Sequence, residues 1–357
     1  MSNNLFIVST PFHLLTAFIL ANTFYEKDIN LLALTHPHGY DHWKENHLLT
    51  FLSSTNAGYQ KVFPLIHWMT HKEKKLSMRQ QVRSVQQSIQ KTPIDKAFLS
   101  SDIDPQNQLL VAALGLTRFY RFEDGLFSYY NEDRKRSISH EYFHKLKLTG
   151  IKWISGIHSS LYLNTSTSGA SPAGIADFMY LPGLLKRPSP QVYEITAEMI
   201  QTAMEILEAN HIIKEKLPKG KYSIYLSQPI TEQGKFSFED EKKCLSLIIN
   251  HLKKGEHLIY KPHPNDAPYK LDYVKKHYPD IIINESKEPV EVILFKEPQI
   301  QKVISYQSTT LILAKKFTQR DILCISLINF YHKPIHPAYR KILEEAGVQF
   351  MSKNENA

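Results

Sequence analysis

Short apolar runs alternate with helix-length segments along both halves of this 357-residue chain, and this alternation limits the possible folds more than any other feature. An alternation of this kind predicts a parallel sheet with helices on both faces. In the first half we expect strands at 5–9, 30–34, 61–65, 96–100 and 118–122, and helices at 12–24, 73–90 and 109–114.

The second half repeats the same order of elements more clearly. Ser237 opens a helix there, and Asp240 stands three residues later, which is the spacing of a capping box. The pattern predicts a second doubly wound sheet. Its expected strands are 222–226, 257–260, 280–283, 302–305 and 322–328, and its expected helices are 237–253, 269–277, 309–317 and 339–346.

The stretch 155–190 between the halves is rich in Ser, Thr, Gly and Pro. This composition favours a long surface loop over a regular element. A helical pattern at 194–210 leads into the second half. We therefore expect two domains, 1–190 and 191–357.

The chain is basic, with a formal net charge of +8 and a pI of about 9.1. Such a charge favours anionic partners such as nucleotides, acidic glycans, nucleic acid or an anionic membrane face. No basic stripe is interleaved with aromatic residues and no known nucleic-acid module is visible, so no nucleic-acid partner is expected.

Two cysteines, Cys244 and Cys324, fall in elements expected to be buried, which favours a reducing compartment over a disulfide framework. No apolar run is long enough to span a bilayer, and the first residues lack the basic region of a signal peptide. The sequence predicts a cytoplasmic protein, compatible with peripheral contact at the inner face of the cytoplasmic membrane.

Four polar segments stand where expected strands end. In open α/β sheets, ligands bind beyond the carboxyl ends of the strands. Two facing domains would bring all four segments to one cleft. The segments are Ser9-Thr10-Pro11, Glu123-Asp124-Gly125, Lys261-Pro262-His263-Pro264 and the run from Ser305 to Thr310.

These residue types suit the transfer of an anionic sugar from a nucleotide. A carboxylate can take the proton of an attacking hydroxyl, and a histidine, which titrates near neutral pH, suits a leaving phosphate. Hydroxyl groups at the start of a helix suit the phosphate itself. Taken singly, each segment is equally well a strand-end turn, a proline-fixed backbone or an N-cap, so only their combination indicates transfer chemistry.

In combination the motifs resemble the bacterial sialyltransferases of GT-B fold, including glycosyltransferase family 52 and the bacterial polysialyltransferases. The resemblance implies an α/β GT-B fold, in which two Rossmann-like doubly wound domains face an interdomain cleft. Residues 1–190 would then bind the acceptor, and residues 191–357 would bind the CMP-sugar. The matching segments are 122–125, 261–264, 308–309, the opening 9–14 and the strand end 225–229.

By the same resemblance, the donor is CMP-sialic acid and the reaction is an inverting single displacement without a metal or other cofactor. Asp124 would be the general base, with Glu123 as the second choice, and His263 would protonate or hydrogen-bond the departing phosphate. The implied donor-binding residues are Thr10, Pro11, Gly125, Ser227, Gln228, Lys261, Pro264, Ser308, Thr309 and Thr310.

The expected reaction is transfer of sialic acid to a galactose-terminated bacterial surface glycan, either a lipooligosaccharide or a capsule. Extension of a sialic acid chain by a polysialyltransferase is the main alternative, followed by a CMP-Kdo-type transferase. An anionic glycan- or nucleotide-binding protein without turnover is the alternative outside enzymes. Residues 126–129, Leu-Phe-Ser-Tyr, differ from the small polar residues of relatives, so the acceptor and linkage stay open.

Two further clusters could bind a ligand. His36 and His38 follow the second expected strand, and we assign them to acceptor contact. Together with Asp41 and His42 they fit no standard zinc spacing, so no metal is expected there. The triplet 102–104, Asp-Ile-Asp, resembles a metal-binding DxD motif, but it precedes Pro105 and more simply predicts a capped turn.

Overall fold

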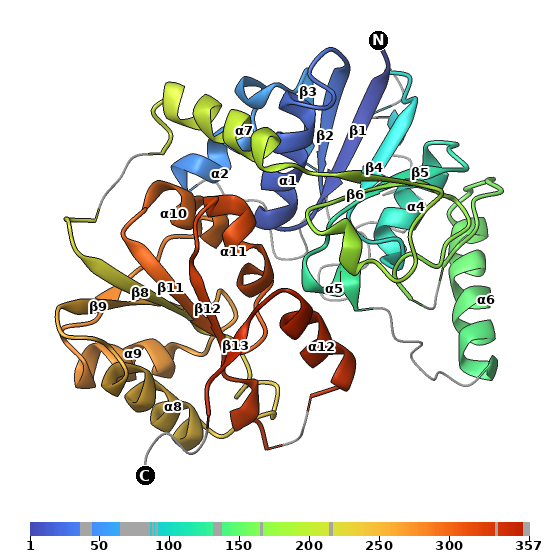
Figure 1. Cartoon of the computed structure of the whole chain (residues 1–357). Helices are drawn as coiled ribbons and strands as arrows, with labels where there is room; N and C mark the ends of the chain where they lie inside the picture. Colours follow the sequence, from blue (N-terminus) through green and yellow to red (C-terminus); the bar gives the residue numbers. More distant parts are fainter. Residues whose placement is uncertain are drawn as a thin grey trace. The chain divides into compact units, whose positions relative to one another are not determined.

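The computed structural model describes residues 1–35, 45–64, 86, 87, 89, 92–130, 138–164, 167–213, 217–332 and 335–352. It divides into two compact units, Met1–Ile212 and Ile213–Ala357. Each unit is a parallel sheet with helices packed against it (Figure 1). Among the described residues, no helix is long and apolar enough to cross a membrane.

The first unit contains a seven-stranded parallel sheet in the order β3-β2-β1-β4-β5-β6-β7. Its strands are β1 (Asn3–Val8), β2 (Ile29–Leu34), β3 (Lys61–Pro64), β4 (Lys96–Leu99), β5 (Phe119–Phe122), β6 (Gly174–Met179) and β7 (Gln191–Glu194). Its α-helices are α1 (Pro11–Asn22), α2 (His47–Leu52), α4 (Pro105–Ala113), α5 (Leu126–Tyr129), α6 (Ile138–Ile154) and α7 (Ala197–Ala209), with short 3-10 turns at Thr55–Ala57 and Pro182–Leu184.

Successive residues of β1 point to opposite faces of this sheet, and both faces are covered. Leu5 shares a buried cluster with Leu109 of α4 and Leu148 of α6. On the other face, Phe6 stacks on Phe98 with ring centroids 4.6 Å apart. A strand buried on both sides reads as a continuous apolar run, which is why the sequence reveals it so clearly.

The second unit contains a six-stranded parallel sheet in the order β10-β9-β8-β11-β12-β13. Its strands are β8 (Lys221–Leu226), β9 (Glu256–Lys261), β10 (Ile282–Ile283), β11 (Ile300–Ser305), β12 (Leu323–Ser326) and β13 (Gln349–Phe350). Its helices are α8 (Phe238–Asn250), α9 (Pro268–His277), α10 (Val290–Lys296), α11 (Thr310–Thr318) and α12 (Pro337–Glu345), with a 3-10 turn at Ile328–Phe330.

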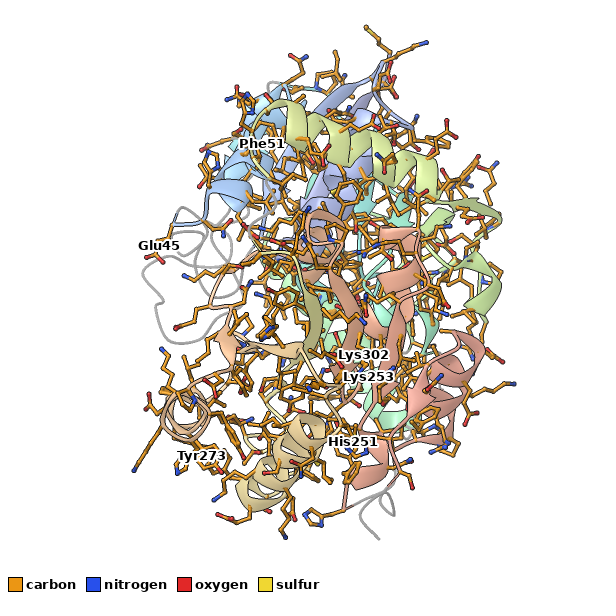
Figure 2. The ribbon with its side chains drawn as sticks, turned by 60° about the vertical axis from the view of Figure 1, so that its left-hand side comes forward. Glu45, Phe51, His251, Lys253, Tyr273 and Lys302 are labelled. Carbon is orange, nitrogen blue, oxygen red and sulfur yellow. The ribbon has the colours of Figure 1, made fainter. Side chains whose placement is uncertain are left out.

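Helices α8 and α9 pack together through aromatic side chains. Tyr273 of α9 is labelled in Figure 2. Its ring lies edge-on to that of Phe238 of α8 at a centroid distance of 5.5 Å. Ser237 caps α8 by accepting a hydrogen bond from the backbone N–H of Asp240, so the predicted N-cap is confirmed, and the Ser237 hydroxyl itself donates to the Asp240 carboxylate. Cys244 and Cys324 are both buried, as the sequence predicts.

Each sheet has one point at which the strand order reverses. In the first unit the chain builds outward from β1 to β3 and then returns to place β4 beside β1. In the second unit it builds from β8 to β10 and returns to place β11 beside β8. Such a reversal leaves a crevice at the carboxyl ends of the two adjacent strands, where ligands bind in open α/β sheets.

The stretch between the halves is more regular than its composition indicates. The prediction of an irregular loop over 155–190 is wrong for β6, which pairs with both β5 and β7. Helix α7 packs on α1 and belongs to the first unit. The boundary between the units therefore falls at 212/213, later in the chain than the expected 190/191. Most of the predicted helix 73–90 lies outside the described residues.

Candidate active site

A histidine–carboxylate pair lies at the strand reversal of the first unit. His13 Nε2 is 2.7 Å from Asp124 Oδ1. His13 Nδ1 is 3.1 Å from the hydroxyl of Ser9 and 3.3 Å from that of Ser100. These residues follow the carboxyl ends of β1, β4 and β5. The local sequence positions His13 in the first turn of α1. Thr10 is the N-cap, its hydroxyl accepts a hydrogen bond from the backbone N–H of His13, and Pro11 begins the helix.

The hydroxyl groups behind His13 set the direction of its hydrogen bonds. When Nδ1 accepts from either hydroxyl, the proton of a neutral ring lies on Nε2 and is donated to Asp124. The imidazole is buried at 5% side-chain exposure, whereas the Asp124 side chain is 23% exposed. The pair therefore presents an oriented carboxylate to solvent with the imidazole behind it.

Glu123 has different surroundings from its neighbour Asp124. It is fully buried and accepts hydrogen bonds from the Tyr129 hydroxyl and from the backbone N–H of Tyr180. Its carboxylate thus joins the end of β5 to helix α5 and to the end of β6. Gly125 follows with φ +79° and ψ −149°, a conformation that favours glycine, and it turns the chain into α5.

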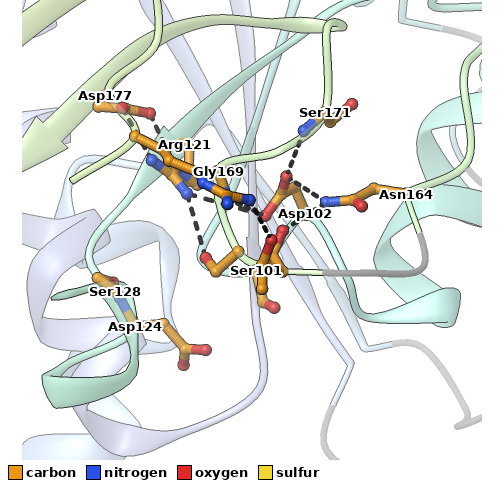
Figure 3. A network of polar contacts seen from close by, with 12 residues as sticks. Ser101, Asp102, Arg121, Asp124, Ser128, Asn164, Gly169, Ser171 and Asp177 are labelled. Carbon is orange, nitrogen blue, oxygen red and sulfur yellow. Dashed lines mark hydrogen bonds and ion pairs between the residues drawn. The ribbon is translucent and has the colours of Figure 1, made fainter. Parts of the chain in front are cut away.

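A buried ionic network supports the same edge of the sheet (Figure 3). Arg121 donates two parallel hydrogen bonds to Asp177 at 2.9 and 2.8 Å. The Asp102 carboxylate accepts hydrogen bonds from the Asn164 side-chain amide and from the backbone N–H groups of Gly169 and Ser171. The segment 167–171 is therefore held by buried acceptors.

The triplet 102–104 performs the structural role that the sequence predicts. Asp104 is the N-cap of α4 and accepts the backbone N–H groups of Gln106 and Asn107. Asp102 belongs to the ionic network, so both carboxylates have protein partners.

In the second unit, the side chain of one glutamine connects the two strands at the reversal. Gln228 follows β8, and its Oε1 accepts the backbone N–H of Gln307, which follows β11, at 2.8 Å. The neighbouring Ser227 is buried and its backbone N–H donates to the carbonyl of Lys261. The carboxyl ends of β8, β9 and β11 are thus tied together by hydrogen bonds.

His263 is half-buried in the turn after β9. Its ring Nδ1 accepts a hydrogen bond from the backbone N–H of Asn265 at 3.1 Å, and the backbone N–H of His263 donates to Asp266 Oδ2 at 2.8 Å. With Nδ1 occupied as an acceptor, the proton of the neutral ring lies on Nε2. Burial lowers the pKa of His263 below its usual value, against the opposing effect of Asp266. The ring is therefore a neutral hydrogen-bond donor at pH 7.

Lys270 connects the His263 turn to the Gln228 segment. Its Nζ lies 3.0 Å from the carbonyl oxygen of Gln228, 2.9 Å from Glu241, 3.0 Å from Glu232 and 3.4 Å from Asp266. Burial lowers the pKa of Lys270, but the attraction of these carboxylates outweighs it and the pKa is raised. The buried cation holds the turn through Asp266.

The other predicted donor-binding residues divide into buried and accessible groups. Lys261 is buried, and its Nζ donates to the carbonyl of Ser286. The buried Thr310 hydroxyl donates to Glu291. In contrast, Ser308 and Thr309 are half-buried at the start of α11, and Pro264 is exposed in the His263 turn. Lys261 and Thr310 are therefore buried and engaged in hydrogen bonds within the second unit, whereas Ser308, Thr309 and Pro264 are accessible to a ligand.

Sequence reasoning missed several of these residues as parts of a site. His13 appears in the motif 9–14, but its role is visible only when α1 places it against Asp124. A histidine three residues after an N-cap at a strand reversal is the sequence signal that could have indicated this role.

The predicted acceptor residues His36 and His38, and with them Asp41 and His42, lie outside the described residues.

Comparison with known proteins identifies the chain's relatives. The model of the alpha-2,8-polysialyltransferase (POLYST) family matches residues 4–321. The chain belongs to this family. It is a glycosyltransferase of the sialyltransferase class, and the predicted resemblance and enzyme class are confirmed. The family favours the predicted alternative, extension of a sialic acid chain, over transfer to galactose. No curated protein sequence matches the chain.

Solved structures show the fold. An S. aureus MnaA–UDP co-structure has a TM-score of 0.54 at 14% identity, covering 97% of this chain and 87% of the other. A Methanocaldococcus jannaschii UDP-GlcNAc 2-epimerase with UDP-GlcNAc and UDP has a TM-score of 0.53 at 10% identity, with 99% and 89% coverage. The glycotransferase of kitacinnamycin has a TM-score of 0.50 at 9% identity, with 98% and 86% coverage. The predicted GT-B fold is confirmed.

Proposed function

We propose that this chain extends a chain of sialic acid residues, using CMP-sialic acid as the donor. The family match supports this acceptor class over a galactose-terminated glycan. The growing chain would be attached to a bacterial lipid or polysaccharide. In this proposal the first unit handles the acceptor and the second unit handles the donor.

The observation that carries the proposed mechanism is the hydrogen bond between His13 and Asp124. An acceptor hydroxyl attacks the anomeric carbon of the donor sugar and gives its proton to the Asp124 carboxylate. The bond from that carbon to the phosphate oxygen breaks, and its electron pair stays on CMP. One displacement of this kind inverts the anomeric configuration. Glu123, which is buried and accepts two donors, holds the loop instead of serving as the base.

The leaving CMP gains negative charge as the bond breaks. A neutral His263 with its proton on Nε2 suits hydrogen-bond donation to that phosphate better than full protonation, because its pKa is lowered. Ser308, Thr309 and the start of α11 supply hydroxyl and backbone donors of the kind that bind phosphate. Every step uses groups of the protein, and the proposal requires no metal.

The test is an elongation assay with CMP-sialic acid and two fluorescent acceptors, a sialic acid trimer and lactose. We expect products longer than the trimer and little transfer to lactose, with CMP released in proportion. Asp124→Asn and His263→Ala should each lower kcat by about 100-fold or more, while Asp124→Asn still binds CMP. Glu123→Gln tests the alternative base, and we expect it to keep more activity than Asp124→Asn.

Three results would contradict the proposal. Efficient transfer to lactose but not to the trimer would restore the galactose acceptor. Turnover with CMP-Kdo but not with CMP-sialic acid would change the donor. Loss of activity in Glu123→Gln, with a fully folded protein and an active Asp124→Asn, would reassign the base.

A further inference from the structure

Helix α6 presents an unusual number of large apolar side chains to solvent. Tyr142, Phe143, Leu146, Trp153 and Ile154 are each between 54% and 74% exposed. Among the described residues, nearly half of the exposed large apolar side chains lie on this one helix. Soluble proteins rarely expose such a contiguous patch unless it binds something. Figure 1 shows α6 at the outer edge of the first unit.

The exposed residues form a single stripe along the helix. At about 100° per residue, the five residues fall within an arc of about 120°. The opposite side of α6 faces the core, because Leu148 is buried there and Ile151 packs against the same cluster. The helix is thus attached to the first unit by one face and leaves its second apolar face uncovered.

Lysines border the stripe on both sides. On the same helical projection, Lys147 lies about 20° beyond one edge and Lys145 about 60° beyond the other. Lys145 Nζ is 4.3 Å from the centre of the Tyr162 ring. An apolar stripe with aromatic residues, bordered by cations, is the pattern of a helix that lies in a membrane interface.

We propose that α6 docks the protein onto an anionic phospholipid surface, with Phe143, Leu146 and Trp153 inserted at the level of the headgroups. Charge complementarity selects this occupant. Anionic lipids attract the bordering lysines, whereas a second copy of the helix would bring like charges together. The inference goes beyond the proposed reaction and requires neither donor nor acceptor.

The test is flotation of the full chain with vesicles of phosphatidylglycerol and phosphatidylethanolamine, and with vesicles of phosphatidylcholine alone. We expect binding to the anionic vesicles, weakened by salt, and little binding to the neutral ones. Phe143→Ser/Trp153→Ser should lower the partition coefficient at least tenfold, and Lys145→Gln/Lys147→Gln should lower it roughly tenfold. None of these side chains belongs to the proposed catalytic machinery, so elongation of a soluble trimer should be unchanged.

Matched variants control for surface changes as such. Val192 and Ile282 are also exposed apolar residues, and Lys275 and Lys276 form a lysine pair on α9. Val192→Ser/Ile282→Ser and Lys275→Gln/Lys276→Gln should leave vesicle binding intact. Equal binding of α6 variants and wild type, or equal binding to neutral vesicles, would overturn the proposal. So would a dimer, measured by sedimentation without lipid, that the Phe143→Ser/Trp153→Ser variant converts to a monomer.

Discussion

Two adjacent acidic residues, Glu123 and Asp124, show how burial assigns different roles to similar side chains. Glu123 is inaccessible and accepts hydrogen bonds from a tyrosine hydroxyl and a backbone N–H. Asp124 reaches solvent and has an imidazole against one oxygen. A proton acceptor must touch its substrate, so accessibility favours Asp124 as the base. Sequence alone leaves this choice open, because the two residues occupy consecutive positions of one motif.

His13 should act as a positioning residue for Asp124. Replacing it with Leu removes the hydrogen-bond donor, and we expect kcat to fall by about 100-fold because the carboxylate is no longer held in place. His13→Gln should recover part of this loss if its amide donates to Asp124. Steady-state kinetics and CMP titration measure the effect. A parallel loss of CMP affinity, or equal activity of the Leu and Gln variants, would contradict positioning.

Lys261 should make stability depend on pH. Burial lowers its pKa from 10.5 to about 8. Between these values the unfolded chain holds a proton that the folded protein has lost, so the free energy of unfolding rises with pH. From about pH 7.5 to about pH 10, wild type should gain about 2 kcal/mol relative to Lys261→Met. Urea unfolding at both pH values measures this.

The comparison between variants removes the contribution of other titrating groups. Buried tyrosines such as Tyr260, whose pKa is raised by burial, affect both proteins alike. Lys243→Met, at an exposed position on α8, serves as the control and should show no such pH-dependent difference from wild type. A difference between wild type and Lys261→Met that stays constant with pH would contradict the prediction.

At the scale of elements, the sequence predicts strands that contain a clear apolar run and misses β6, whose apolar residues are interrupted and flanked by loop-like composition. β1 and β2 each end in four consecutive apolar residues, 5–8 and 31–34, and these runs predict the strands. β6 contains Gly174 and Asp177, and its neighbours are Ser, Gly and Pro. Asp177 is tolerated because Arg121, 56 residues away, pairs with it. A partnership across such a separation has no local signal, so the sequence alone predicts a loop here.

Gly169 tests how tightly the ionic network holds this segment. It has φ +81°, and an added Cβ would lie 2.6 Å from Arg121 Nη1 and 2.7 Å from the carbonyl oxygen of Arg187. Gly169→Ala should lower the free energy of unfolding by roughly 2–4 kcal/mol, from backbone strain and overpacking together. Urea unfolding followed by fluorescence measures the change.

Gly234 supplies the matched control for that substitution. It also has a positive φ, +65°, but no heavy atom lies within 4 Å of an added Cβ. Gly234→Ala should therefore show only the backbone cost, about 1 kcal/mol. Equal losses in the two variants would mean that the segment moves aside and that the network does not hold it rigidly.

At the scale of the whole molecule, strand-end motifs place candidate polar residues at the carboxyl ends of the strands in each sheet. Topology makes this placement predictable, because the carboxyl ends of adjacent parallel strands meet at one edge of the sheet whatever the details of packing. The motifs identify Asp124, His263 and Ser308 as candidates in this way. They do not identify the contacts of His13 and Lys270, because these depend on how helices α1 and α9 pack on their sheets. The predicted roles of all these residues stay proposals.

The net charge of +8 gives a prediction that concerns the acceptor as a whole. A sialic acid chain carries one carboxylate per residue, so a longer acceptor gains more from a basic protein. Raising the ionic strength from about 0.1 M to about 1 M shortens the Debye length from about 10 Å to about 3 Å. The KM for a long sialic acid oligomer should then rise several-fold more than the KM for a trimer.

Elongation kinetics at the two salt concentrations measure this difference directly. The KM for CMP-sialic acid, varied at a saturating trimer concentration, serves as the control, because the donor has the same small charge in every assay. A salt effect that grows with acceptor length would mean that basic residues beyond the reacting end attract the chain and keep it near the enzyme between additions. Identical salt effects for the long oligomer and the trimer would mean that the enzyme recognises only the terminal residues, and that the basic charge serves another anion, such as the phospholipid surface proposed for α6.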